Sequence, residues 1–176
     1  MKIATFLPSD EAAALRNEPW RARPRLGVVT DDGMLDVAAA ARIMGDTQLD
    51  VDGATFHREA HTLLDGLIDL VARADGPLLD ANDVISGAAV PKPSKILCAG
   101  LNYRRHAEEA GAAIPDEPIL FSKFENTLVG NDAEVRLRGM GHVDYEAELA
   151  VVIGAPARDV ATTNALDYVL GYVNAN

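Results

Sequence analysis

Two glutamates separated by one residue, Glu146 and Glu148, are the side chains of this sequence best suited to binding a cation. They lie in a run that predicts a strand over residues 143–153, and alternation along a strand places both on one face, about 7 Å apart. Two carboxylates beside the apolar run 150–153 repel each other, and a bound cation would relieve that repulsion. Oxygen ligands favour Mg²⁺, Mn²⁺ or Ca²⁺ over zinc. Spacing alone leaves open the alternative of an exposed acidic strand face.

His142 and Asp144 share the same predicted face, so a site for a transition metal made of histidine and carboxylate can also be drawn. His142 follows the sequence GMG at 139–141, which predicts a flexible turn. We therefore rank this site below the two-glutamate site and expect an exposed histidine.

A second group with catalytic chemistry is His106 with Glu109. The segment predicts a short helix over 103–110 that is closed by Gly111. Residues three apart on a helix have Cβ atoms about 5–6 Å apart, whereas Glu108 points elsewhere. A carboxylate beside an imidazole makes it a stronger base near neutral pH, as general-base catalysis requires. The alternative is a surface ion pair that contributes little.

Two further side chains deserve a prediction. Lys123 ends the apolar strand predicted over 118–123 and could bind a substrate carboxylate, although it could also be an ordinary strand-end lysine. Cys98, in the strand predicted over 95–99, is expected to be a small core residue. As the single cysteine it excludes a disulfide within one chain, which suits a reducing cytoplasm.

The composition restricts the classes of partner that the protein is expected to bind. The 176 residues include 16 basic and 27 acidic side chains, a formal net charge of −11, which argues against binding nucleic acid or an anionic membrane. No apolar stretch approaches the roughly 18 residues of a membrane span, and the first residues lack a signal-peptide pattern. We predict a cytoplasmic protein.

The remaining pattern predicts an α+β, strand-rich fold. Short strands are expected over 3–7 and 26–30, the second closed by the turn sequence Asp31-Asp32-Gly33. Helices are expected over 36–44, 56–74 and 163–169, and the second carries one apolar stripe made of Leu63, Leu64, Leu67, Ile68 and Val71. Prolines at 77, 91 and 93 predict an extended connector, which places a domain boundary near residue 90. The expected domains are therefore a small N-terminal α/β domain, 1–90, and a second domain, 91–176.

An ordered series of motifs resembles the fumarylacetoacetate hydrolase family, in the bacterial branch with a small N-terminal domain. The series reads KILC at 95–98, GLNY at 100–103 with His106, the strand 118–123, DYEAEL at 144–149, VIG at 152–154 and GY at 171–172. The opening residues 1–6 and the run RLGVV at 25–29 also look like the family's accessory domain. The resemblance therefore spans nearly the whole chain.

The resemblance implies roles for these residues. Residues 91–176 would be the first part of a β-sandwich or roll catalytic domain. Glu146 and Glu148 would be two of three acidic ligands to Mg²⁺ or Mn²⁺, His106 and Glu109 the acid/base pair, and Tyr103 and Lys123 substrate-binding residues. The family's third ligand, an aspartate, is expected immediately after Asn176, so the 176-residue chain is expected to be incomplete and inactive by itself.

The function that the resemblance implies is hydrolysis of acylpyruvate or fumarylacetoacetate-type 1,3-dioxo acids, with C–C cleavage through a metal-stabilised enolate. Decarboxylation of an oxaloacetate-type 2-oxo acid, or isomerisation, on the same scaffold is the alternative, because the scaffold does not fix the reaction. A non-catalytic or truncated inactive family member is the alternative of another class. A homodimer is expected from the family alone.

Overall fold

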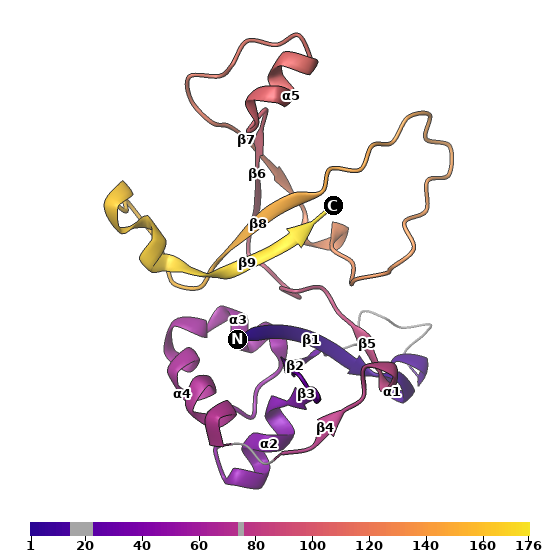
Figure 1. Cartoon of the computed structure of the whole chain (residues 1–176), viewed down its shortest axis with the longest axis vertical. Helices are drawn as coiled ribbons and strands as arrows, with labels where there is room; N and C mark the ends of the chain where they lie inside the picture. Colours follow the sequence, from indigo (N-terminus) through magenta and orange to yellow (C-terminus); the bar gives the residue numbers. More distant parts are fainter. Residues whose placement is uncertain (15–22, 74–75) are drawn as a thin grey trace. The chain divides into compact units, whose positions relative to one another are not determined.

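The computed structural model describes residues 1–14, 23–73 and 76–176 (Figure 1). The chain divides into two units, Met1–Pro91 together with Val129–Asn176, and Lys92–Leu128. The boundary expected from the sequence near residue 90, with domains 1–90 and 91–176, stays a prediction. Over the described ranges, no helix combines the length and the apolar character that crossing a bilayer requires.

An antiparallel five-stranded sheet with the order β4-β3-β2-β1-β5 forms the N-terminal part of the first unit. The strands are β1 (Lys2–Pro8), β2 (Arg25–Thr30), β3 (Gly33–Asp36), β4 (Leu78–Leu79) and β5 (Val84–Ser86). Thr30 pairs with Gly33 across the two-residue turn Asp31-Asp32, and its hydroxyl donates to the Gly33 carbonyl oxygen at 2.9 Å. The two strands and the turn predicted from the sequence are confirmed.

Four helices accompany this sheet: α1 (Ser9–Ala14), α2 (Val37–Met44), α3 (Gly53–Arg58) and α4 (Ala60–Arg73). Helix α2 agrees with the predicted helix over 36–44; it begins after Asp36, which caps it, and ends at Gly45 in the left-handed region, with φ 73°. The helix predicted over 56–74 is wrong as a single element. It is split at Glu59, which is the C-cap of α3, and Ala74 lies outside the described residues.

The core lies between the sheet and these helices, where Phe6, Leu26, Leu35, Phe56, Leu67 and Leu70 are among the residues that are fully or almost fully buried. Burying such a side chain contributes roughly 1.5–3 kcal/mol each. The predicted stripe on α4 is correct for Leu67, with Leu63, Leu64 and Val71 partly buried against the core. It is wrong for Ile68, which is 49% exposed, and it missed Leu70.

The C-terminal part of the first unit is a two-stranded antiparallel ribbon of β8 (Glu148–Ile153) and β9 (Val169–Ala175). The strand predicted over 143–153 is wrong in its first half, because β8 begins only at Glu148. The helix predicted over 163–169 is instead the 3₁₀ helix η4 (Thr162–Tyr168). Leu149, Val151 and Ile153 are exposed, since a ribbon of two strands buries little on either face.

The second unit is also built on a two-stranded ribbon, β6 (Ile96–Gly100) paired with β7 (Ile119–Lys123). Helix α5 (Arg104–Glu109) connects them, and Gly111 follows it with φ 63°. The predicted strands and the helix with its closing glycine are confirmed within one residue at each end. Cys98, opposite Phe121, is only partly buried, so its assignment to the core is wrong. In the part of the chain that the structure describes, β6 and β7 form a ribbon of two strands. The α+β, strand-rich fold class is confirmed.

Candidate metal centre

Glu146 and Glu148 stand where the chain enters β8. Glu148 is the first residue of the strand and pairs with Ala175, the last residue of β9. Ala147 between the two glutamates has φ 49°, in the left-handed region. The backbone N–H of Glu146 donates to the side-chain oxygen of Asn176 at 2.8 Å, and the N–H of Ala147 donates to the same oxygen at 3.4 Å. Both carboxylates are exposed.

Strand alternation does not place the Glu146 and Glu148 carboxylates on one face, because Ala147 leaves the extended conformation. The two Cα atoms nevertheless lie within about 7 Å, the reach of two residues. The same correction removes the strand that would align His142 with Asp144, since residues 142–147 are outside any strand. The assignment of Glu146 and Glu148 as ligands stays a prediction.

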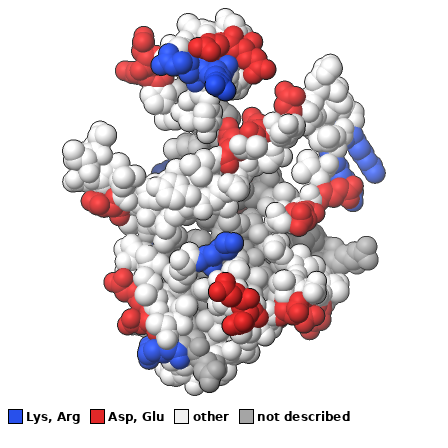
Figure 2. All heavy atoms as spheres, in the orientation of Figure 1, with Lys and Arg blue, Asp and Glu red and all other residues white. Residues whose placement is uncertain are grey.

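The donor chemistry of the two carboxylates fits a hard divalent ion, which takes oxygen ligands. They are a partial set: across the residues that the structure describes, no three His, Cys, Asp or Glu side chains gather so that they could hold a metal ion. On the face shown in Figure 2, acidic side chains are scattered among uncharged ones and are not collected in one place. Further oxygen ligands, from water or protein, would have to complete the coordination.

His106 and Glu109 lie on α5, three residues apart, as the sequence predicted. The helix begins after Tyr103, which is its N-cap residue without a side-chain cap and is 57% exposed. Ala107 is the fully buried residue of the helix, and His106 and Glu109 are both exposed. Within the described ranges no ion pair joins His106 to Glu109. Their pairing as acid and base stays a prediction.

Lys123 lies at the other end of the β6–β7 ribbon from α5. It pairs with Ile96, whereas Gly100, from which the chain continues into α5, pairs with Ile119. Ile96 and Gly100 are four positions apart along β6, which is about 13 Å at the usual rise of a strand. The unit therefore does not bring Lys123 together with Tyr103 and His106.

A hollow of about 220 Å³ lies at the Lys123 end of this ribbon. Its lining residues include Ser94, Lys95, Lys123 and Glu125. An ammonium group can bind a carboxylate, so Lys95, which lines the same hollow as Lys123, is a candidate that the sequence analysis missed. The position of Lys95 before β6 did not indicate this role, because only the pairing of β6 with β7 brings Lys95 to the same hollow as Lys123.

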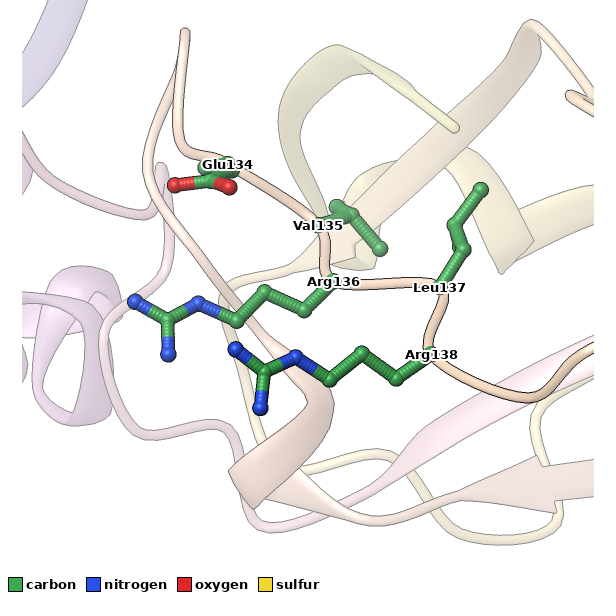
Figure 3. A pocket seen from close by; sticks show the side chains of 5 residues that line it. All are labelled: Glu134, Val135, Arg136, Leu137 and Arg138. Carbon is green, nitrogen blue, oxygen red and sulfur yellow. The ribbon is translucent and has the colours of Figure 1, made fainter.

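A second hollow, of about 400 Å³, is lined by residues 134–138 (Figure 3). Arg136 and Arg138 extend to one side of this segment, while Leu137 points to the other side. The alternation Val-Arg-Leu-Arg was the signal that the sequence analysis passed over. Guanidinium groups bind carboxylates well, but all five lining residues are consecutive, so the hollow is bounded by one segment alone.

Comparison with known proteins finds similarity to one family over the second half of the chain. Residues 95–176 match the family model described as fumarylacetoacetate (FAA) hydrolase C-terminal. A fumarylacetoacetate hydrolase domain-containing protein 2 homolog of Dictyostelium discoideum is 52% identical over 86 residues, which are 48% of this chain and 28% of that protein. The mitochondrial oxaloacetate tautomerase fahd2 of Xenopus laevis is 31% identical over 184 residues, which cover 100% of this chain and 51% of that protein.

Among solved structures, the maleylpyruvate hydrolase of Sphingobium sp. SYK-6, in complex with manganese(II) and pyruvate, superposes with a TM-score of 0.68. It is 24% identical, over 99% of this chain and 57% of that one, which shows a shared fold. The chain spans about half, or less, of the length of these proteins. The predicted resemblance to the fumarylacetoacetate hydrolase family is confirmed for residues 95–176, the part of the chain that matches the family model.

Proposed function

We propose that this chain is part of a divalent-metal-dependent enzyme that hydrolyses acylpyruvate or fumarylacetoacetate-type 1,3-dioxo acids. The observation that carries the proposal is the arrangement of Glu146 and Glu148 at the start of β8, with the intervening backbone bonded to Asn176. The Sphingobium relative supports it, because that protein holds manganese(II) together with pyruvate, a 2-oxo acid.

Each predicted residue has a role in this proposal. Glu146 and Glu148 would hold Mg²⁺ or Mn²⁺, or Ca²⁺, which when bound supplies Lewis-acid polarisation of a chelating 2-oxo acid. His106, with Glu109 one helical turn away, would take the proton of the attacking water. Lys123 would bind a substrate carboxylate, and Tyr103, exposed at the start of α5, would contact the same substrate.

Isomerisation of an oxaloacetate-type acid is the second candidate. It is supported by the Xenopus oxaloacetate tautomerase, whose similarity runs over the whole of this chain. Keto–enol conversion needs a proton moved between carbon and oxygen and no attacking water. His106 would then move that proton, and no C–C bond would break.

Two properties of the chain follow from the proposal. Two carboxylates are a small ligand set for an ion that prefers six oxygen ligands, so residues 1–176 by themselves should hold the ion weakly and be inactive. We also propose that the exposed apolar side chains of β8 are covered in a homodimer, as size-exclusion chromatography with light scattering would measure. The cytoplasm is our proposal for the compartment, and the name of the Xenopus relative makes the mitochondrion the alternative.

The test combines metal titration with product analysis. Mn²⁺ binding to the chain is measured by calorimetry for the wild type, Glu148→Gln and the control Glu134→Gln, an exposed glutamate outside the site. We expect Glu148→Gln to weaken binding at least about tenfold, the lower bound for removing part of a metal site, and Glu134→Gln to leave it unchanged. In the whole enzyme of which we propose that this chain is part, an acylpyruvate at saturating Mn²⁺ should yield pyruvate and a second acid. Unchanged Mn²⁺ affinity in Glu148→Gln would refute the ligand assignment, and enol–keto conversion without cleavage would favour the tautomerase.

A further inference from the structure

The side chain of Asn176 accepts hydrogen bonds from the chain next to the pair Glu148–Ala175 of the β8–β9 ladder. The last ladder pair is Glu148 with Ala175. Beyond it, the side-chain oxygen of Asn176 accepts hydrogen bonds from the N–H groups of Glu146, at 2.8 Å, and Ala147, at 3.4 Å. A carbonyl oxygen has two lone pairs, so these two donors use its accepting capacity.

The backbone that Asn176 holds is in a conformation that alanine rarely adopts. Ala147 has φ 49°, and a left-handed residue with a Cβ costs roughly 1–2 kcal/mol. Such a conformation persists only where the surroundings determine it. The bonds from the Glu146 and Ala147 N–H groups to Asn176 fix the chain before the turn, and the pair Glu148–Ala175 fixes it directly after. Asn176 does so although it is separated from Glu146 by 30 positions along the chain.

We propose that Asn176 is a positioning residue, which fixes the directions of the Glu146 and Glu148 carboxylates relative to each other through the turn at Ala147. The inference rests on the proposed function in one respect, that these glutamates bind the divalent ion. Asn176 itself is not a ligand in this arrangement, because its oxygen is engaged by the two N–H groups. A change at residue 176 therefore acts on the metal through the glutamates.

The first test measures the turn without metal. Hydrogen exchange of the Glu146 and Ala147 amides is followed by NMR in the metal-free wild type, Asn176→Ala, Asn176→Asp and the control Asn174→Ala, an asparagine of β9 opposite Leu149. Asn176→Ala should speed exchange of these two amides at least about tenfold, because they lose their acceptor. Asn176→Asp should keep them slow, since a carboxylate accepts the same bonds, and Asn174→Ala should leave both unchanged.

The second test measures Mn²⁺ affinity in the same proteins by calorimetry. Loss of a supporting group next to metal ligands weakens binding about 10- to 100-fold, which is the loss expected for Asn176→Ala but not for Asn174→Ala. If Asn176→Ala does not fold, Asn176→Gln, which keeps the amide but moves its oxygen, replaces it in both tests.

The outcomes separate the inference from the proposed function. Slow exchange and unchanged Mn²⁺ affinity in Asn176→Ala would overturn the inference, as would equal effects in Asn174→Ala. If the exchange result holds but the wild type takes up no Mn²⁺, the metal assignment of the two glutamates fails. In that case Asn176 retains the role of fixing the turn and loses its connection to a metal.

Discussion

Lys123 stands opposite Ile96 in the β6–β7 ribbon, at the end remote from α5. The chain enters α5 from Gly100, whose partner is Ile119 at the other end. A side chain that binds the substrate carboxylate at Lys123 and one that moves a proton at His106 would therefore act on different parts of a substrate. Their substitutions should have separable kinetic effects.

Lys123→Met should raise KM for a 2-oxo acid by roughly 10- to 100-fold and change kcat less, because a charge-assisted hydrogen bond contributes about 1.5–3 kcal/mol to binding. Steady-state kinetics at saturating Mn²⁺ would measure this. Lys95→Met is the matched comparison, since Lys95 lines the same hollow and is the second candidate for the carboxylate. An equal rise of KM in both variants would mean that the hollow binds the carboxylate through its combined charge and not through Lys123.

His106→Ala should lower kcat by about 10²- to 10⁴-fold, the usual share of general acid/base catalysis, and leave Mn²⁺ affinity unchanged. Glu109→Gln should lower kcat less than His106→Ala but more than Glu108→Gln, because Glu109 lies three residues from His106 on α5. Both glutamates are exposed on the same helix, so they are a matched pair. A larger effect of Glu108→Gln would show that α5 does not set the partner of His106.

The sequence was sufficient where the determinants are local. The hairpin at Asp31-Asp32-Gly33 and the start of α2 after Asp36 follow from turn and capping residues within a few positions. The break at Glu59 was missed because the apolar residues Phe56 and Ala60, four positions apart, keep helical spacing across it. The apolar stripe was also misassigned, since helical spacing fits Ile68 as well as Leu70, and only packing within the core selects Leu70.

The entry into β8 shows what a local pattern cannot contain. The run 143–149 alternates as a strand does, yet the strand begins at Glu148 because Ala147 is held in the left-handed region by a residue 29 positions away. The same limit applies to Lys95, which joins the hollow at Lys123 only through the register of β6 with β7. Both are long-range pairings, which residue types and spacing do not encode.

Asp36→Ala should lower the free energy of unfolding by about 2–4 kcal/mol, because it removes a helix cap and a nearly buried ion-pair partner together. One carboxylate oxygen of Asp36 accepts from the N–H of Ala39 at 3.2 Å, and the other accepts from Arg25 Nη1 at 2.8 Å. The side chain of Asp36 is 4% exposed. The hydrogen bond that Arg25 donates to Asp36 also raises the pKa of the Arg25 guanidinium above its usual value, so this group stays charged.

Urea unfolding followed by circular dichroism would measure the loss. Asp52→Ala is the matched control, since Asp52 caps α3 by accepting from Thr55 N–H at 2.7 Å. It should cost only about 1 kcal/mol, as for a typical cap. Asp36→Asn, which can still cap α2, should fall between the two. Equal losses in Asp36→Ala and Asp52→Ala would show that the Arg25 bond adds nothing to stability.

His57 should make the fold sensitive to mild acid. Both ring nitrogens are buried and make no hydrogen bond of good geometry within the described residues, although the Ala89 backbone lies close to the ring. The ring stands edge-on to Phe56 with centroids 5.6 Å apart. Burial lowers the pKa of His57 in the folded protein, opposed only in part by the backbone of Ala89. The folded state therefore favours the neutral ring, whereas the unfolded chain titrates near its ordinary pKa of about 6.5.

The difference between the His57 pKa in the folded and unfolded states sets the direction in which stability changes with pH. Above pH of about 6.5 the ring is neutral in both states and the full stability is present; as pH falls through the lowered pKa of the folded state, that stability is lost. The free energy of unfolding, measured in urea at intervals from pH 7.5 to pH 4.5, should fall below about pH 6.5. His57→Leu should flatten this fall and leave stability at neutral pH unchanged or slightly higher, because it removes two unsatisfied polar atoms. His61→Leu, at an exposed histidine of α4, is the control and should keep the wild-type slope. If His57→Leu retains the same slope as His61→Leu, the acid sensitivity arises from carboxylates and not from the buried imidazole.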